Sequence, residues 1–344
     1  MGFVRFFLAL LVLVSHTGYA MRDIGPLAAV EAFFVLSGLY MAAVYTTRYS
    51  RIENGARLFY LNRFLRLYPT YALLVLVTAA CAFAVRGQPG DYRHVFDLFH
   101  AQPDIGTTTL ASVWASVVAI FGQDILSVAE PLHFLLPVRQ GWSIASELLF
   151  YASVPLLFRY MSVFRCAVGV VVFMVIKYAL LYYGGWRMAY FLPVGNFAYF
   201  LLGYGLYLVS VDPRVEAIKA RVYPFRYAVL AAMLGTLFVM GDASLETGGP
   251  RHHAAMLAVL CSGCVLLFQR ASARLDLFLG NIAYGVYLNH FLLVVLGQAM
   301  GLADLALVGW AVAASLVFAY LTERAIQDPV DRYRRGLTGL PEGR

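Results

Sequence analysis

Ten long apolar runs, separated by short polar or basic segments, divide this sequence of 344 residues. A run of about 20 apolar residues is long enough to cross the hydrocarbon core of a bilayer as a helix. Hydrophobic residues make up 61% of the chain and charged residues only 13%, which excludes an ordinary soluble domain. We therefore predict an all-α polytopic membrane protein with about ten transmembrane helices. The runs cover residues 2–20, 26–46, 69–86, 142–158, 165–183, 189–210, 226–240, 252–269, 279–301 and 304–325.

One further run, 108–127, is weaker and more polar, and whether it spans decides the orientation of every later helix. If it does not span, the basic segments 48–66 and 211–226 lie on the same side of the membrane as both termini. Lys and Arg concentrate in cytoplasmic loops, so the charge pattern favours this arrangement. We predict that both termini are cytoplasmic and that residues 87–141 form one long outer excursion with an interfacial or re-entrant helix. The formal net charge of +7 then reflects orientation, and no nucleic-acid partner is expected.

The rest of the sequence favours a single membrane-embedded domain. No soluble domain, repeat or low-complexity linker interrupts residues 1–330, and residues 331–344 are expected to form a short polar cytoplasmic tail. The first run lacks an A-x-A-like cleavage site, so we expect a retained helix rather than a signal peptide. The four cysteines lack metal-ligand spacing, so we predict inert packing residues and no metal site. They are Cys81, Cys166, Cys261 and Cys264.

Arg5 and His16 stand out within the first apolar run. Ionisable residues are costly inside a bilayer and are therefore candidates for function. Eleven residues make three helical turns plus roughly 20°, so the two side chains share one face, roughly 16 Å apart along the axis. The pair therefore predicts that functional side chains lie along one helix face, from one membrane surface toward the other.

Three titratable residues on different predicted helices have similar expected depths. His16, Glu31 and Glu147 each lie about four or five residues from the outer end of an apolar run, or roughly 6–7 Å below the surface. Each one alone is equally well explained as an interfacial side chain reaching water. Together they suggest a general base, because a carboxylate beside an imidazole orients it and stabilises its protonated form.

The cytoplasmic side carries a different pattern, in the segment FYLNRFLRLYP. Arg63 and Arg66 lie three residues apart on one helix face that leads to Pro69. They either anchor the protein by the positive-inside rule or bind phosphate, whose oxygens match the guanidinium fork. Arg5 is expected nearby, at the inner end of the first helix.

Several segments, in order along the chain, resemble motifs of the acyltransferase 3 family of membrane-embedded O-acyltransferases. The spacing of Arg5 and His16 matches its Arg-x10-His signature. The second-helix motif G-V-D-x-F-F-V-x-S-G-F resembles AVEAFFVLSGLYM, and F-Y-x-x-R-x-x-R-I-x-P resembles FYLNRFLRLYPTY. The motif W-S-L-x-x-E-x-x-F-Y-x-x-x-P resembles GWSIASELLFYASVPLL. The ninth-helix motif L-G-x-x-S-Y-x-x-Y-L-x-H resembles LGNIAYGVYLNHFLL, and the closing E-x-P-type end resembles LTERAIQDP.

The sequence departs from the family pattern at three positions. Glu31 replaces the usual Asp, Ala283 replaces Ser, and Asn289 precedes His290 where an aromatic residue is common. None of these changes removes the expected base. Many members carry a fused extracytoplasmic hydrolase-like domain, and we expect this chain to be a stand-alone member.

The resemblance implies transfer of an acyl group, acetyl in the first instance, from cytoplasmic acyl-CoA to a sugar hydroxyl. The acceptor is expected to be an exported polysaccharide or a glycosylated small molecule, at the outer side of a bacterial cytoplasmic membrane. His16, oriented by Glu31, is the expected base, and Arg5, Arg63 and Arg66 are expected to bind the donor. The residues expected to shape or support the acceptor pocket are Trp142, Ser143, Glu147, Tyr287 and His290. The expected partners are acyl-CoA, the carbohydrate and membrane lipids, with no permanently bound cofactor.

A secondary transporter of a small anionic or glycosylated solute is the alternative, since ten helices with intramembrane charges also suit that class. Against it, the second half of the sequence does not mirror the first, and the polar residues gather near the first, second and fourth helices. A receptor or scaffold is disfavoured by the intramembrane histidine and carboxylates. The sequence leaves open the acyl group, the acceptor, the oligomeric state, and direct transfer as against an acyl-enzyme.

Overall fold

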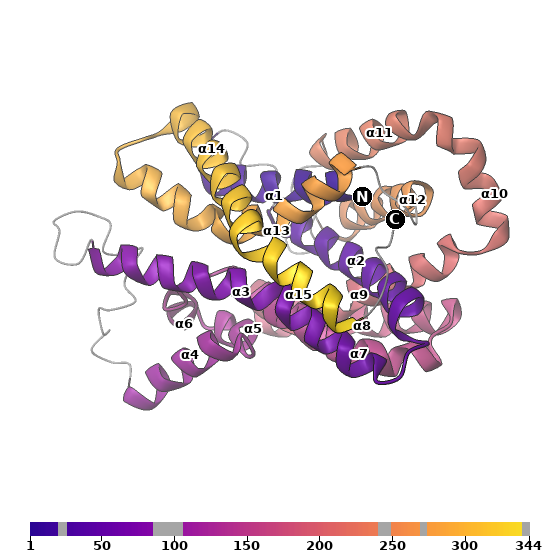
Figure 1. Cartoon of the computed structure of the whole chain (residues 1–344), viewed down its shortest axis with the longest axis horizontal. Coiled ribbons are helices and arrows are strands. Elements are labelled where there is room, and N and C mark those ends of the chain that lie inside the picture. Colours follow the sequence, from indigo (N-terminus) through magenta and orange to yellow (C-terminus); the bar gives the residue numbers. More distant parts are fainter. Residues whose placement is uncertain (20–25, 85–105, 240–248, 269–273, 339–344) are drawn as a thin grey trace.

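The computed structural model describes residues 1–19, 26–84, 106–239, 249–268 and 274–338, which fold into helices without a β-strand (Figure 1). The helices are α1 Gly2–His16, α2 Pro26–Val44, η1 Tyr45–Tyr49, α3 Gly55–Ala84, α4 Thr107–Ala119, α5 Gln123–Val128, α6 Glu130–Phe134, α7 Gly141–Tyr160, α8 Val163–Phe191, α9 Pro193–Ser210, α10 Pro213–Val222, η4 Tyr223–Phe225, α11 Arg226–Val239, α12 Gly249–Leu267, α13 Arg274–Ala299, α14 Asp304–Thr322, η5 Glu323–Gln327 and α15 Asp328–Thr338.

The prediction of an all-α polytopic membrane protein is confirmed. Within the described ranges, seven helices are long and apolar enough to cross a membrane, or eight if the pair formed by α9 and α10–α11, bent by 85°, counts as one span. The helix α1 is apolar but shorter, with 15 residues. Each of the ten predicted runs falls largely within a helix, while the count of ten spans and the side of the termini stay predictions.

The expected outer excursion is only partly visible. Residues 87–105 lie outside the described residues, and residues 106–141 contain α4, α5 and α6. The ambiguous run 108–127 is broken into two short helices, because Ile120 and Gly122 both have positive φ angles, of 66° and 84°. Neither of these helices has the length of a bilayer span.

The centre of the bundle is α2, which packs on α9 and α7. In the apolar 18-residue stretch of the span that contains α2, 78% of the residues are buried, against 11% in that of the peripheral α8. Because Gly203 on α9 has no side chain, α9 approaches α2 so closely that a Cβ atom at this position would overlap the backbone of Val35. Small residues allow such close packing between membrane helices.

A second tight pair consists of α1 and α13, which run parallel. A Cβ atom at Gly2 would overlap the carbonyl of Asp276, and the N-terminal amine pairs with that same aspartate at 2.9 Å. At the other end of the pair, the ring of His16 lies against the ring of His290. This register brings the end of α1 to the middle of α13.

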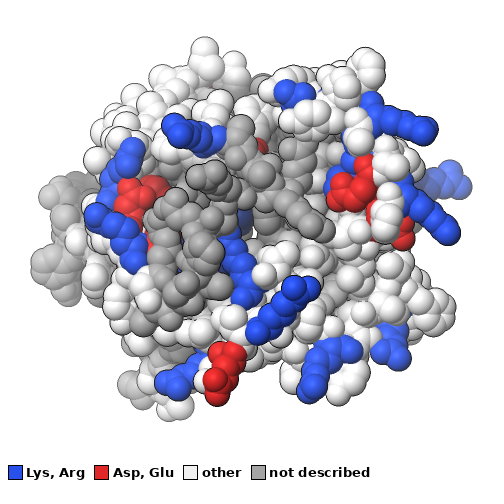
Figure 2. Space-filling view, turned by 45° about the vertical axis from the view of Figure 1, so that its right-hand side comes forward, with Lys and Arg blue, Asp and Glu red and all other residues white. Residues whose placement is uncertain are grey.

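The chain continues past α14 through η5 into α15, which packs along α3 (Figure 1). Residues 331–338 of the expected polar tail are therefore helical and contact the bundle, and residues 339–344 lie outside the described residues. Figure 2 views the molecule from the side of α10–α12, and on this face basic side chains outnumber acidic ones.

Candidate functional site

The helix α13 carries polar side chains at every third position, namely Asn281, Tyr284, Tyr287 and His290. Residues three apart are neighbours on a helix surface, and each step rises by about 4.5 Å. The four side chains therefore form a row that winds along roughly 13 Å of the axis. This row connects the candidate site residues at the two ends of the bundle.

The first half of the row contacts α3. The Asn281 side-chain oxygen accepts a hydrogen bond from Arg66 at 3.3 Å, and the Tyr284 hydroxyl donates to the carbonyl of Leu67 at 2.9 Å. The row thus begins beside the pair of arginines that the sequence singled out.

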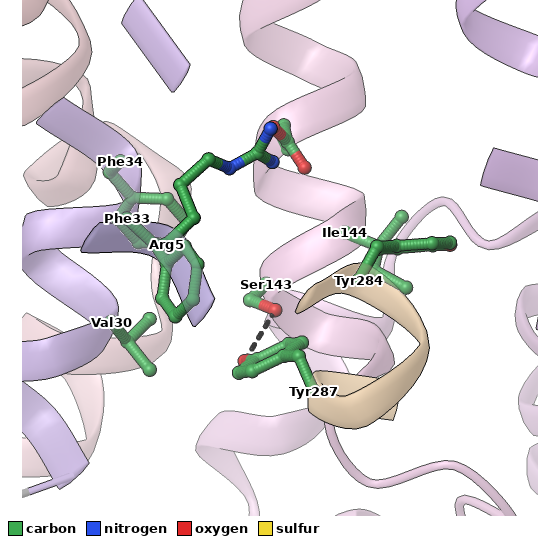
Figure 3. Close-up of a pocket in the computed structure, with 9 residues that line it drawn as sticks. Arg5, Val30, Phe33, Phe34, Ser143, Ile144, Tyr284 and Tyr287 are labelled. Atoms are coloured by element: carbon green, nitrogen blue, oxygen red, sulfur yellow. Dashed lines mark hydrogen bonds between the residues drawn. The ribbon is translucent and has the colours of Figure 1, made fainter. Parts of the chain in front are cut away.

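A narrow cavity of about 40 Å³ lies against the middle of the row. Its polar lining comes from three helices, with Arg5 on α1, Ser143 and Glu147 on α7, and Tyr284 and Tyr287 on α13. The hydroxyls of Ser143 and Tyr287 are hydrogen-bonded at 2.8 Å, while apolar side chains of α2 line the opposite wall (Figure 3). Arg5 therefore faces the cavity and not the expected phosphate site on α3, and its Nε atom is buried without an acceptor among the described residues.

The last position of the row lies against the end of α1. The rings of His16 and His290 are stacked, with centroids 5.1 Å apart and planes inclined by 25°. His16 is exposed, whereas His290 is completely buried. The Nδ1 atom of His290 lies 2.6 Å from the carbonyl of Tyr287. Because a carbonyl only accepts, Nδ1 carries the proton, and the buried Nε2 presents a lone pair with no partner in the described structure.

Aromatic and basic side chains beside the two histidines complete this end. The Phe291 ring meets the His16 ring edge-on, with centroids 6.0 Å apart. The Arg139 guanidinium lies 4.6 Å from the ring centroids of both Phe291 and Phe134. Burial lowers the Arg139 pKa to about 10, so the side chain stays cationic at neutral pH.

A third histidine lies near this end but is neutral. Burial, reinforced by the charges of Arg139 and Arg187, lowers the pKa of His133 to about 3. Its Nδ1 atom is hydrogen-bonded to the Ser127 hydroxyl at 2.9 Å. Arg187 donates to the carbonyls of Ser127 and Val128 at 2.7 and 3.0 Å, which fixes α8 to the junction of α5 and α6.

At the opposite end of the row, basic side chains of α3 meet the C-terminal helices. Arg66 lies 3.8 Å from Glu323 and 3.7 Å from Asp331, and Arg334 pairs with Asp331. Arg63 has no acidic partner among the described residues. Three arginines against two carboxylates leave this cluster with an excess positive charge.

Arg63 is the least engaged arginine of the cluster. Its Nη1 atom lies 3.6 Å from the sulfur of Met41, its guanidinium lies 5.8 Å from the Phe59 ring, and its Nε is buried without an acceptor within the described ranges. A guanidinium without an oxygen partner is available to an anionic ligand.

Glu31 does not contact His16 as we expected. Its completely buried carboxylate accepts a hydrogen bond from Tyr199 at 2.5 Å and lies 3.3 Å from Lys177 and 3.2 Å from His253. No hydrogen bond or ion pair joins it to His16 in the part of the chain that the structure describes. These partners come from α8, α9 and α12. The carboxylate therefore links four helices instead of orienting the imidazole of His16.

Glu147 also lies elsewhere than expected. Its carboxylate accepts hydrogen bonds from Ser37 and Tyr151. Ser37 lies six positions beyond Glu31 on α2, or about 9 Å further along the axis. The expected single layer of His16, Glu31 and Glu147 is therefore not formed, and Glu147 lies deeper, beside the cavity.

Trp142 packs behind the cavity wall. Its ring lies 6.0 Å from Phe34, 4.7 Å from Tyr190 and 5.0 Å from Phe191. Among the pocket residues expected from the sequence, Ser143, Glu147 and Tyr287 line the cavity, whereas Trp142 supports it from behind.

The sequence interpretation missed Asn281 and Tyr284, although the spacing N-x-x-Y-x-x-Y-x-x-H was visible in the ninth-helix motif. It also missed Arg334, which reaches the cluster from the expected tail, and Arg139, which is held between nearby Phe134 and distant Phe291. Among the residues described, no group of three or more His, Cys, Asp and Glu side chains is arranged to hold a metal ion.

These features define a class of protein: a helical membrane protein whose basic end and imidazole end are joined by a polar path past an internal cavity. Comparison with protein families makes the assignment specific, because the acyltransferase 3 model, described as an acyltransferase domain, matches residues 1–324. The chain belongs to the acyltransferase 3 family, and it is an acyltransferase of the membrane-embedded type. No curated protein and no solved structure gives a significant match to it.

Proposed function

We propose that this protein transfers a short acyl group, acetyl in the first instance, from acyl-CoA to a sugar hydroxyl across the membrane. The acceptor is an exported polysaccharide or a glycosylated small molecule. The observation that carries the proposal is the row from Asn281 to His290, which leads from the basic cluster on α3, past the cavity, to His16. A donor with an anionic head and a long thioester arm matches such a path.

The packing directions of the helices support the orientation that this reaction needs. The helices α1 and α13 run parallel, because Gly2 meets Asp276 and Gly280 while His16 meets His290. If both helices cross the membrane, they begin on the same side of it. The chain must then cross the membrane an even number of times between the start of α1 and the start of α13. The ten predicted spans give an even number of crossings before α13. Residues 108–127, as a further crossing, would make that number odd. Together with the positive-inside bias, this parity supports a cytoplasmic position for the basic cluster.

Arg63 and Arg66 are the proposed ligands of the donor phosphates, with Arg334 beside them. Arg66 is partly neutralised by Glu323 and Asp331, so Arg63 supplies most of the uncompensated charge. Guanidinium groups bind phosphate by paired hydrogen bonds. This cluster therefore suits the nucleotide and diphosphate portion of acyl-CoA.

Arg5 takes a different role from the phosphate contact first expected. It lines the cavity with Ser143 and Tyr287, near the middle of the path. In this position it is suited to bind a polar part of the donor arm that passes the cavity, because its Nε has no acceptor among the described residues. It lies roughly 16 Å along the axis from His16, so it does not act on the carbonyl that is attacked there.

His16 is the proposed general base. It takes the proton from the acceptor hydroxyl as the oxygen attacks the thioester carbonyl. The C–S bond then breaks, and the departing sulfur takes that proton from the imidazolium, so that CoA leaves as the thiol and His16 is neutral again. His290 stacks on His16 and holds its ring, the positioning role first assigned to Glu31. Glu147 and Trp142 shape the cavity and its wall. The donor is consumed in each turnover, and no permanently bound cofactor is invoked.

The test is incubation of the purified protein in detergent or nanodiscs with acetyl-CoA labelled on its acetyl group. We expect slow hydrolysis, or transfer when acceptor glycans are added, and loss of both in His16→Ala. The control is His252→Ala, an exposed histidine of α12, which should keep full turnover. Absence of any acetyl release from the folded unmodified protein would overturn the proposal and favour a transporter.

A further inference from the structure

Arg139 is held between two aromatic rings beside the candidate catalytic histidine. Its guanidinium carbon lies 4.6 Å from the centroids of both Phe134, on α6, and Phe291, on α13. The two rings fix the guanidinium by cation–π contacts without occupying its N–H donors. In the described part of the chain, no carboxylate and no hydrogen-bond acceptor engages this side chain.

The charges around Arg139 do not compensate it. The described titratable groups at this end of the bundle, besides Arg139, include His16, His133 and Arg187. Burial keeps His133 neutral, and Arg187 adds a second positive charge at this end. The described structure therefore presents a positive, half-buried site with unused donors, which is what an anionic oxygen group requires.

The position of Arg139 distinguishes among possible ligands. Phe291 contacts both the His16 ring and the Arg139 guanidinium, so both groups border one aromatic ring. This shared contact places Arg139 beside the proposed acceptor position at His16. It matches two substituents on one sugar ring, with a hydroxyl at His16 and a charged group at Arg139. The donor phosphates belong to the other end of the path, at Arg63.

We propose that Arg139 binds a carboxylate or phosphate group of the acceptor, so that the acceptor is an acidic saccharide and not a neutral one. This inference rests on the proposed function, because it takes His16 as the place where the acceptor hydroxyl reacts. It narrows the substrate class of that site and assigns a specificity-determining residue that lies outside the family motifs quoted above.

The test measures saccharide binding without acyl-CoA. Methyl glucuronide, glucose 6-phosphate and methyl glucoside serve as probes for the full-length protein in a neutral detergent, by saturation-transfer NMR with titration. We expect at least one charged probe to bind about tenfold more tightly than methyl glucoside, since hydrogen bonds to charged groups have this magnitude. The two charged probes distinguish a carboxylate from a phosphate ligand.

Arg139→Gln should remove the preference for the charged probe and leave binding of methyl glucoside unchanged. The matched control is Arg251→Gln, an exposed arginine of α12 that should keep the preference. Arg139→Lys, which retains the charge, should keep part of it and serves as the second variant if Arg139→Gln does not fold. Equal binding of charged and neutral probes by the unmodified protein, or a full preference in Arg139→Gln, would overturn the inference. The acetyl-CoA assay fails or succeeds independently of this measurement.

Discussion

His16 and His290 lie face to face, with ring centroids 5.1 Å apart, one exposed at the end of α1 and the other completely buried in α13. The buried ring is itself fixed, because its Nδ1 atom donates to the carbonyl of Tyr287. The two imidazoles, on parallel helices, thus form a stacked pair, and the exposed ring of His16 is accessible to substrate. His16 is thus paired with His290, and not with Glu31 as the sequence suggested.

The stack predicts a positioning role for His290. His290→Ala should lower kcat for acetyl transfer, by about tenfold or more, because His16 loses the surface that holds its ring. His290→Phe retains a flat ring of similar size and should restore much of the rate. Measurement of kcat together with the melting temperature separates this effect from a loss of folding. Equal rates in the two variants would contradict a role for the stacked ring.

The unequal surroundings of Arg63 and Arg66 predict different phenotypes. Arg63→Ala should raise KM for acetyl-CoA by about tenfold while kcat changes less, as expected when uniform binding energy is lost. Arg66→Ala should raise KM less and also lower stability, because Arg66 is partly neutralised by Glu323 and Asp331 and its loss leaves them without their shared partner. Arg57→Ala, an exposed arginine on the same helix, is the control for steady-state kinetics. An unchanged KM in Arg63→Ala would restore simple membrane anchoring as the role of this segment.

The buried contacts of Glu31 predict a structural role. Glu31→Ala should destabilise the protein by about 3–5 kcal/mol, the usual cost of removing one partner of a buried ion pair. The double variant Glu31→Leu with Lys177→Met replaces both charges by apolar groups and should recover much of the melting temperature. Thermal unfolding and acetyl transfer should be measured on both proteins. A stable Glu31→Gln variant without activity would instead return Glu31 to the catalytic site.

Topology is testable by accessibility of single cysteines, introduced after replacement of the four native ones. Thr108→Cys, on α4, should react with an impermeant thiol reagent in intact cells. Val215→Cys, on the basic α10, should react only after permeabilisation. Labelling of both positions from the same side would show that residues 108–127 cross the membrane. The proposed orientation, with Arg63 on the cytoplasmic side and His16 on the outer side, would then lose its support.

The sequence by itself determined the class of protein and the contents of each helix. Apolar runs of bilayer length specify membrane helices, and the 3.6-residue period places Arg5 with His16 on one face. The same local rule brings Tyr284, Tyr287 and His290 into one row. These features depend on residues close in the chain, so periodicity predicts them.

Only the tertiary structure decided which helices meet and at what height. Glu31 received partners from α8, α9 and α12, and Glu147 was displaced to the level of Ser37. The axial register between helices is set by close contacts such as those at Gly2 and Gly203, which depend on the shapes of two distant surfaces. Depth counted from the end of each apolar run ignores such shifts, and for that reason the shared layer of His16, Glu31 and Glu147 could be expected from the sequence and yet is not formed.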